Sequence, residues 1–173
     1  MKRLYLLRHA KSSWANEGLS DFDRPLNKRG RRAAALMGEF MEENGYHPQL
    51  ILSSPSARTR ETLTILERHG SWTHDTRFED DLYGASSFVM LNRLRGLPDT
   101  AAAVMLLGHN PGLESMAHLM TGDGAPDALS KLRAKYPTAA LSVISFGAGT
   151  WRDVRPGAGT LEAFVRPADL EKE

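Results

Sequence analysis

Short, nearly continuous runs of apolar residues recur along the chain. They occupy residues 4–7, 50–52, 104–107 and 140–146. Apolar runs of this length, without strict alternation, are typical of strands that are buried on both faces of a sheet. We therefore predict four core strands that lie between two layers of helices.

The segment between the first two runs has the periodicity of a helix. Its apolar side chains recur at intervals of three and four residues, which places them on one face. They are Ala33, Leu36, Met37, Phe40 and Met41. Gly45 comes shortly after this stripe, and it predicts the end of the helix because glycine readily adopts the left-handed conformation of a C-terminal cap.

A second helix is predicted after the second apolar run. Ser54 is a typical N-cap, Pro55 suits the first turn, and Gly70 marks the end. Two more helices are predicted, at about 86–96 and after the sequence NPG at 110–112. Strands that alternate with helices predict the α/β class, as a three-layer α/β/α fold with a mainly parallel central sheet.

The composition supports one globular domain and narrows its function. The chain has 173 residues, of which 41% are hydrophobic and 25% charged, and it contains no repeat or linker, so we predict a single domain over residues 1–173. With a net charge of +1, the chain lacks the excess of basic residues typical of proteins that bind nucleic acid, so we do not expect a nucleic-acid partner. The absence of cysteine excludes disulfides, thiol catalysis and thiolate metal sites.

No segment predicts export or insertion into a membrane. The apolar run that follows Lys2 and Arg3 ends at Arg8, which is too short for a signal peptide, and no later run could span a bilayer. We therefore expect a cytoplasmic protein with no membrane partner.

Arginine and histidine side chains stand where the predicted strands end. Arg8 and His9 follow the first strand, His109 follows the third, and Arg58 lies near the start of the helix after the second. Parallel strands end at one edge of a sheet, where α/β proteins bind ligands, so we expect these side chains to converge. Arg58 is favoured over Arg60 because residues two apart on a helix point in different directions, and a helix N-terminus attracts anions.

Paired histidines could also indicate a metal site. Here an arginine is expected near each histidine, and its positive charge would repel a metal cation. The guanidinium group of arginine instead matches the geometry of phosphoryl oxygens. The residues therefore predict a phosphate pocket that uses no metal and no cofactor. In that pocket His9 would attack phosphorus, and the arginines would stabilise the charge of the transition state.

Three blocks of the sequence resemble the histidine phosphatase superfamily, which shares its fold with the phosphoglycerate mutases. They are LRHAKS at 7–12, SSPSARTRET at 53–62 and GHNPGLE at 108–114. The resemblance covers about residues 4–146, and the loop DFDRPLNKRG at 21–30 is also similar to the segment that follows the nucleophile in this family. It implies that His9 is the phosphorylated nucleophile and that its phosphate ligands are Arg8, Arg58, His109 and Asn110.

The chain departs from the family pattern at two points. Ala10 stands where the family's motif has glycine, as in the short branch of SixA-type phosphohistidine phosphatases. Many members also place a general acid between the second and third blocks, and this chain offers Glu79, Asp80 and Asp81 there. Alignment on Leu82 favours Asp81.

The length of the chain bears on the substrate. Mutases and small-molecule phosphatases of this fold carry insertions that cap the pocket, and 173 residues leave little room for such a lid. We therefore expect a metal-independent phosphatase that acts on phosphohistidine in phosphoproteins. A small-molecule phosphomonoesterase and a non-catalytic phosphate-binding or phosphoprotein-binding module remain alternatives. The expected partner is a phosphorylated protein or a small phosphorylated substrate, and the expected state is a monomer.

Overall fold

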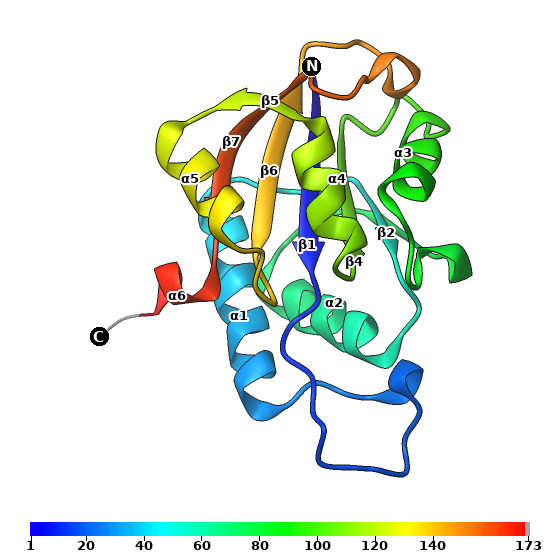
Figure 1. Cartoon of the computed structure of the whole chain (residues 1–173), viewed down its shortest axis with the longest axis vertical. Helices are drawn as coiled ribbons and strands as arrows, with labels where there is room; N and C mark the ends of the chain where they lie inside the picture. The colour runs from blue at the N-terminus through cyan, green and yellow to red at the C-terminus, as the bar shows by residue number, and fades with distance from the viewer. Residues whose placement is uncertain (172–173) are drawn as a thin grey trace.

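A single seven-stranded sheet runs through the protein in the computed structural model, which describes residues 1–171 (Figure 1). Residues 172 and 173 of the predicted domain lie outside the described residues. The strands are β1 (Lys2–Arg8), β2 (Leu50–Ser53), β3 (Asp75–Phe78), β4 (Ala103–Gly108), β5 (Thr121–Gly124), β6 (Leu141–Phe146) and β7 (Gly159–Val165). Their order across the sheet is β3-β2-β4-β1-β6-β7-β5.

The sheet is mainly parallel, as predicted. Strands β3, β2, β4 and β1 are parallel neighbours, β6 is antiparallel to both β1 and β7, and β5 is parallel to β7. The carboxyl ends of β1, β2, β3 and β4 therefore lie at the same edge. In Figure 1 this edge is the lower one, toward which the β1 arrow points.

Helices cover both faces, which confirms the three-layer α/β/α arrangement. They are α1 (Lys28–Glu43), α2 (Ala57–His69), α3 (Ser87–Arg95), α4 (Gly112–Met120), α5 (Pro126–Ala134) and α6 (Pro167–Leu170). Short 3-10 helices are η1 (Asp21–Asp23), η2 (Asp80–Leu82) and η3 (Trp151–Asp153). In the part of the chain that the structure describes, no helix combines the length and apolarity needed to cross a membrane.

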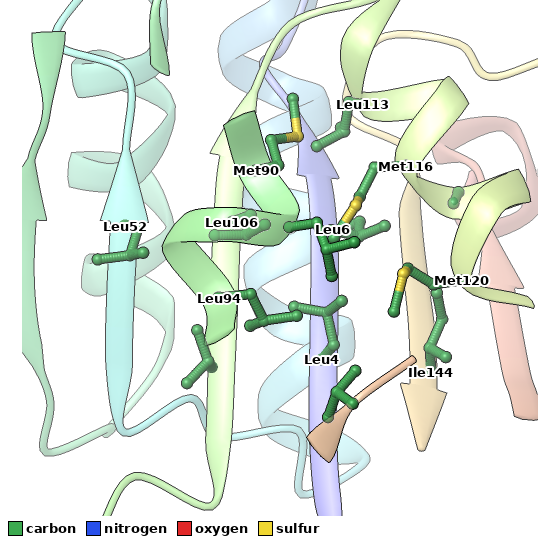
Figure 2. Packing of buried hydrophobic residues seen from close by; sticks show 14 of the residues in the cluster. Leu4, Leu6, Leu52, Met90, Leu94, Leu106, Leu113, Met116, Met120 and Ile144 are labelled. Carbon is green, nitrogen blue, oxygen red and sulfur yellow. The ribbon is translucent and has the colours of Figure 1, made fainter. Parts of the chain in front are cut away.

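Alternate residues of β1 build the two halves of the core. Leu4 and Leu6 face α3 and α4, where they pack among Met90 and Met116 (Figure 2). Tyr5 and Leu7 belong to the cluster on the other face of the sheet, together with side chains of α1 and α2. Because the middle of β1 is buried on both faces, residues 4–7 form a continuous apolar run, as expected for a central strand.

The predicted core strands and the end of the first helix are confirmed. The four apolar runs became β1, β2, β4 and β6. Gly45 follows α1 with a φ of +67°, so it occupies the left-handed region that glycine adopts without strain. The helices predicted at about 86–96 and after 110–112 are α3 and α4.

The predicted start of the second helix is wrong by two residues. The N-cap of α2 is Ser56, whose side chain accepts a hydrogen bond from the Thr59 amide, and the helix begins at Ala57. Ser54 still belongs to the extended chain after β2, because its amide donates to the Leu107 carbonyl of β4 at 3.0 Å. The Ser54 hydroxyl is thereby left for another partner, which lies in the candidate site.

Candidate active site

His9 is held at the carboxyl end of β1 by its own backbone. Its amide donates to the Gly108 carbonyl at 3.0 Å, which continues the pairing of β1 with β4 by one residue. The carbonyls of Arg8 and His9 both lie 3.0 Å from the amide nitrogen of Ala139. Ala139 has a φ of +60°, so the connection between α5 and β6 adopts a left-handed turn where it contacts this segment. Both sides of the strand end therefore fix where the His9 ring lies.

The hydrogen bond of the His9 ring determines which nitrogen is free to react. Nδ1 lies 2.6 Å from the Ala10 carbonyl oxygen, and a carbonyl oxygen can only accept. Nδ1 therefore carries the hydrogen, and in the neutral ring Nε2 keeps its lone pair. Burial lowers the pKa of His9 to about 3, and the positive charges nearby act in the same direction. At neutral pH the ring is an unprotonated nucleophile at Nε2.

His109 lies beside His9 in the opposite tautomer. The two ring centroids are 5.1 Å apart. The guanidinium of Arg58, which can only donate, places Nη2 3.3 Å from Nδ1 of His109. The ring hydrogen is therefore on Nε2, which donates to the Ser54 hydroxyl at 2.8 Å. Burial first, and the Arg58 charge second, lower the pKa of His109 to about 4.

Arg58 is the arginine of α2 that faces the two histidines. It is 6% exposed, and besides the contact with His109 its guanidinium donates to the backbone carbonyl of Asp21 at 2.6 Å and to the Asp21 carboxylate at 3.1 Å. Arg60 points away, and its guanidinium packs 3.9 Å from the centre of the Phe78 ring. The start of α2 thus provides one arginine to the pocket and turns the other toward solvent.

Arg8 reaches the same region from β1. Its Nη1 donates to the Tyr136 carbonyl at 2.9 Å, and the side-chain amide of Asn110 donates to the same oxygen at 3.0 Å. The carbonyl oxygen of that Asn110 side chain accepts from the Glu114 amide at 3.2 Å. Tyr136 is itself fixed, because its buried hydroxyl donates to the Leu6 carbonyl at 2.6 Å. Both predicted phosphate ligands are therefore anchored on one backbone oxygen.

Asp21 is a member of the cluster that the sequence did not single out. Its carboxylate accepts hydrogen bonds from the Tyr83 hydroxyl, from Arg24 and from Arg58. The Tyr83 hydroxyl, followed by the two arginines, lowers the pKa of Asp21 well below its usual range. The sequence offered one signal for this residue, because the segment that begins at Asp21 is similar to the family's segment after the nucleophile. A polar segment does not indicate which of its side chains turns toward the pocket.

The three candidate acids have different surroundings. Glu79 forms an ion pair with Arg93 of α3, and two nitrogens of that arginine contact its carboxylate. Asp80 and Asp81 are exposed, and neither side chain makes a hydrogen bond or ion pair with another described residue. The role of Asp81 as general acid stays a prediction.

A cavity of about 340 Å³ opens next to His109. Its lining includes His109, Asn110, Gly112 at the start of α4, and Ser86 and Phe88 at the start of α3. Because two helices begin at this cavity, their free amide groups give it a positive potential. Within residues 1–171, no group of three or more histidine, aspartate or glutamate side chains is arranged to hold a metal ion. The arrangement fits the binding of a phosphoryl group between neutral imidazoles and arginines.

Comparison with known proteins agrees with this geometry. The model of the histidine phosphatase superfamily (branch 1) matches residues 4–148. An uncharacterized protein of Mycobacterium tuberculosis is 31% identical over 163 residues, which is 93% of this chain and 99% of that protein. An uncharacterized chloroplastic protein of Arabidopsis thaliana is 34% identical over 184 residues, with 96% of this chain and 78% of that protein covered.

A solved structure is also similar over nearly the whole length. The protein from Agrobacterium tumefaciens that carries the name phosphohistidine phosphatase SixA is 34% identical, with a TM-score of 0.81. The match covers 96% of this chain and 98% of that one. The fold and most of the chain are therefore shared with that protein.

Proposed function

Because the chain belongs to the histidine phosphatase superfamily and is a phosphatase of the SixA type, we propose that it hydrolyses phosphohistidine carried by other proteins. In this proposal His9 takes the phosphoryl group, and water then removes it. Arg8, Arg58, His109 and Asn110 hold the phosphoryl oxygens. The name of the similar Agrobacterium tumefaciens protein supports the choice of phosphohistidine.

The observation that carries the choice of a protein substrate is the apolar rim, a set of exposed apolar side chains at the edge of the sheet that holds the pocket. In the described chain, all large apolar residues that are exposed, apart from Met1, lie on segments at the carboxyl edge of the parallel strands. They are Trp14, Leu19, Phe22, Phe78, Tyr83 and Phe88. Exposed aromatic side chains gathered on one surface are typical of protein interfaces, and a small phosphate ester could not cover them.

The reaction follows from the tautomer of His9. Nε2 of His9 attacks the phosphorus of the substrate, and the bond between phosphorus and the substrate imidazole breaks. The leaving imidazole takes a proton from solvent, which is favourable near neutral pH because its ordinary pKa is about 6.5. Water then attacks the phosphorus on His9, releases inorganic phosphate and restores the neutral ring. Both steps build charge on oxygens that the arginines stabilise.

Labelling tests this proposal directly. The protein is mixed with a protein that carries ³²P-phosphohistidine, quenched after milliseconds and analysed for label. We expect label on His9 that is stable in base and lost in acid, together with release of inorganic phosphate. His9→Ala should take up no label and release no phosphate. Turnover by that variant at the normal rate would exclude the covalent mechanism.

The general acid gives a second measurement, which concerns the substrate. The leaving group of a phosphate monoester is an alkoxide that needs a proton, and a positioned general acid typically raises the rate 10²–10⁴-fold. The imidazole that leaves from phosphohistidine can take its proton from solvent and needs no positioned acid. We expect Asp81→Asn to lower kcat/KM on a monoester much more than on phosphohistidine, with Glu79→Gln as the comparison. If the wild-type protein already has a higher kcat/KM on monoesters than on phosphohistidine, it is instead a small-molecule phosphatase.

A further inference from the structure

A second and larger cavity lies next to the candidate active site. It has a volume of about 540 Å³ and opens between α1, α6 and the connection from α5 to β6. Figure 1 shows α6 beside α1, which it contacts. Five cationic residues and one carboxylate contribute to its lining. They are Arg8, Lys11, Arg29, Lys135, Arg166 and Glu171.

Arg8 joins this cavity to the candidate active site. The residue lines the cavity, and its guanidinium shares the Tyr136 carbonyl with Asn110, which lines the cavity next to His109. The positive charges of Arg8 and Arg58 also lower the pKa of His9 by acting on its ring, after the larger effect of burial. A group bound at Arg8 therefore has the phosphoryl site on one side and the cationic cavity on the other.

The positive charge of this cavity is poorly compensated. Arg166 is paired with Asp169 at 2.7 Å. Lys11, Arg29 and Lys135 are exposed and make no ion pair with any carboxylate of residues 1–171. The net charge of the whole chain is only +1, so this concentration of cations is a local feature. Like charges that face one cavity repel one another, and an anionic ligand would relieve that repulsion.

The backbone keeps two of these cations in a fixed relation. Lys11 follows the His9 segment, and its carbonyl accepts a hydrogen bond from the Asn27 amide at 3.0 Å. A Cβ atom on Gly30 would lie 2.1 Å from that carbonyl oxygen, so the start of α1 packs directly on the backbone of Lys11. The close contact between the start of α1 and the segment after His9 therefore fixes the backbone of Arg29 beside that of Lys11.

We propose that this cavity binds acidic side chains that flank the phosphohistidine in the protein substrate. This inference rests on the proposed function. Exposed lysines and arginines on separate elements suit several carboxylates, whereas one phosphate group is bound more tightly by converging buried arginines such as Arg58. The cations act on encounter and on KM, because exposed charges raise the association rate more than they stabilise a transition state.

Turnover of matched peptides tests the cavity. The substrates are a phosphohistidine peptide with aspartate and glutamate flanks, the same peptide with asparagine and glutamine flanks, and phosphoimidazole. The wild-type protein should prefer the acidic peptide by roughly ten-fold in kcat/KM at low salt, and Arg29→Glu combined with Lys135→Glu should abolish that preference. The kcat on phosphoimidazole should remain unchanged, which also shows that the variant is folded.

The matched control reverses two cations at the other end of the sheet. Arg152 and Arg155 are exposed in the connection from β6 to β7, which lies at the Lys2 end of β1 because β6 is antiparallel to that strand. Arg152→Glu combined with Arg155→Glu changes the net charge equally and should keep the preference. Equal loss in both double variants, or no preference in the wild-type protein, would overturn the proposal.

Binding without turnover separates this inference from the proposed function. The unphosphorylated acidic peptide is titrated into ¹⁵N-labelled protein, and amide shifts are followed by NMR. Shifts at Lys11, Ala33 and Thr138 that vanish in the cavity variant would support the acidic subsite even if phosphohistidine is not a substrate. Shifts confined to other surfaces, or none at millimolar peptide, would overturn the subsite even if phosphohistidine is hydrolysed.

Discussion

Ser54 shows how one side chain can serve a different purpose from the one its local sequence indicates. A serine before proline at the start of a helical pattern is a typical N-cap. In the structure that role belongs to Ser56, and the Ser54 hydroxyl instead accepts from Nε2 of His109. The sequence could not distinguish the two serines, because the partner of Ser54 lies 55 residues away in the chain.

We expect Ser54→Ala to lower kcat about five-fold, since a hydrogen bond of this kind contributes about 1 kcal/mol. Without the hydroxyl, the His109 ring is free to exchange tautomers and its contact with Arg58 becomes less well defined. The pH dependence of kcat should also change, which a purely structural role would not cause. Ser54→Thr should restore most of the rate.

Ser56→Ala is the control for this prediction. It removes the N-cap of α2 and should lower the free energy of unfolding by about 1 kcal/mol, with a smaller effect on kcat than Ser54→Ala has. If the two variants lose stability and rate in the same proportion, Ser54 acts only through the fold.

Arg58 and Arg60 provide a second comparison at the scale of residues. Arg58→Ala removes a buried guanidinium that contacts His109, and it should lower kcat/KM by roughly 10²-fold or more, by analogy with other preorganised donors to an oxyanion. Arg60→Ala should change kcat/KM less than two-fold, because this side chain packs on Phe78. Steady-state kinetics on one phosphorylated substrate measures both, and equal losses would contradict the assignment of the helix face.

At the scale of elements, burial decided which strands could be recognised. The four apolar runs gave β1, β2, β4 and β6, whose residues are almost entirely buried. The edge strands β3, with the sequence DTRF, and β5, with TGDG, were missed because none of their residues is buried and they carry few apolar residues. Their conformation comes from pairing with β2 and β7, which is a long-range contact that local composition does not encode.

The contact between α4 and the loop before α3 is an element-scale feature that one glycine permits. A Cβ atom on Gly112 would lie 1.8 Å from the Ala85 carbonyl oxygen. Gly112→Ala must therefore separate the two segments that line the smaller cavity, and we expect a loss of about 1–3 kcal/mol in the free energy of unfolding. KM should rise as well, because the cavity next to His109 changes shape.

Gly96→Ala is the matched control for that substitution. Gly96 has a φ of −88°, and a Cβ atom there would lie 3.7 Å from the carbonyl oxygens of Arg93 and Asn92. Alanine fits there without strain, so stability should remain within about 0.5 kcal/mol of wild type. Urea denaturation of both variants measures the difference, and a tolerated Gly112→Ala would show that α4 can shift without cost.

At the scale of the whole molecule, topology made part of the site predictable. Parallel strands end at one edge, so the positions of Arg8, His9 and His109 at strand ends were enough to expect their convergence. Asp21 and Tyr83 could not be found in this way, since neither lies at a strand end and each meets Arg58 only through the complete fold. The cationic cavity is formed in part by α6, which follows the last strand and carries no sequence motif that would have predicted the cavity.

The burial of two histidines also affects the stability of the whole molecule. The pKa values of His9 and His109 fall to about 3 and about 4 in the folded state, whereas an unfolded chain has histidine pKa values of about 6.5. Above pH 6.5 both states are neutral at these positions, and the burial has no effect on pH dependence. Between pH 6.5 and 4 the unfolded chain binds protons that the folded protein does not, so acid favours unfolding.

We therefore expect the free energy of unfolding to fall as pH decreases from 6 to 5, and the two buried histidines to account for roughly 2 kcal/mol of that loss. His9→Asn combined with His109→Asn removes both titrating rings, so its stability should depend less steeply on pH by that amount. His118→Asn changes an exposed histidine of α4 and should leave the slope as it is in wild type. Urea denaturation at pH 7, 6 and 5 gives the three slopes. Parallel curves for the wild type and the double variant would mean that the two rings take up protons in the folded protein as they do in the unfolded chain, and burial would then not keep His9 neutral below pH 6.5.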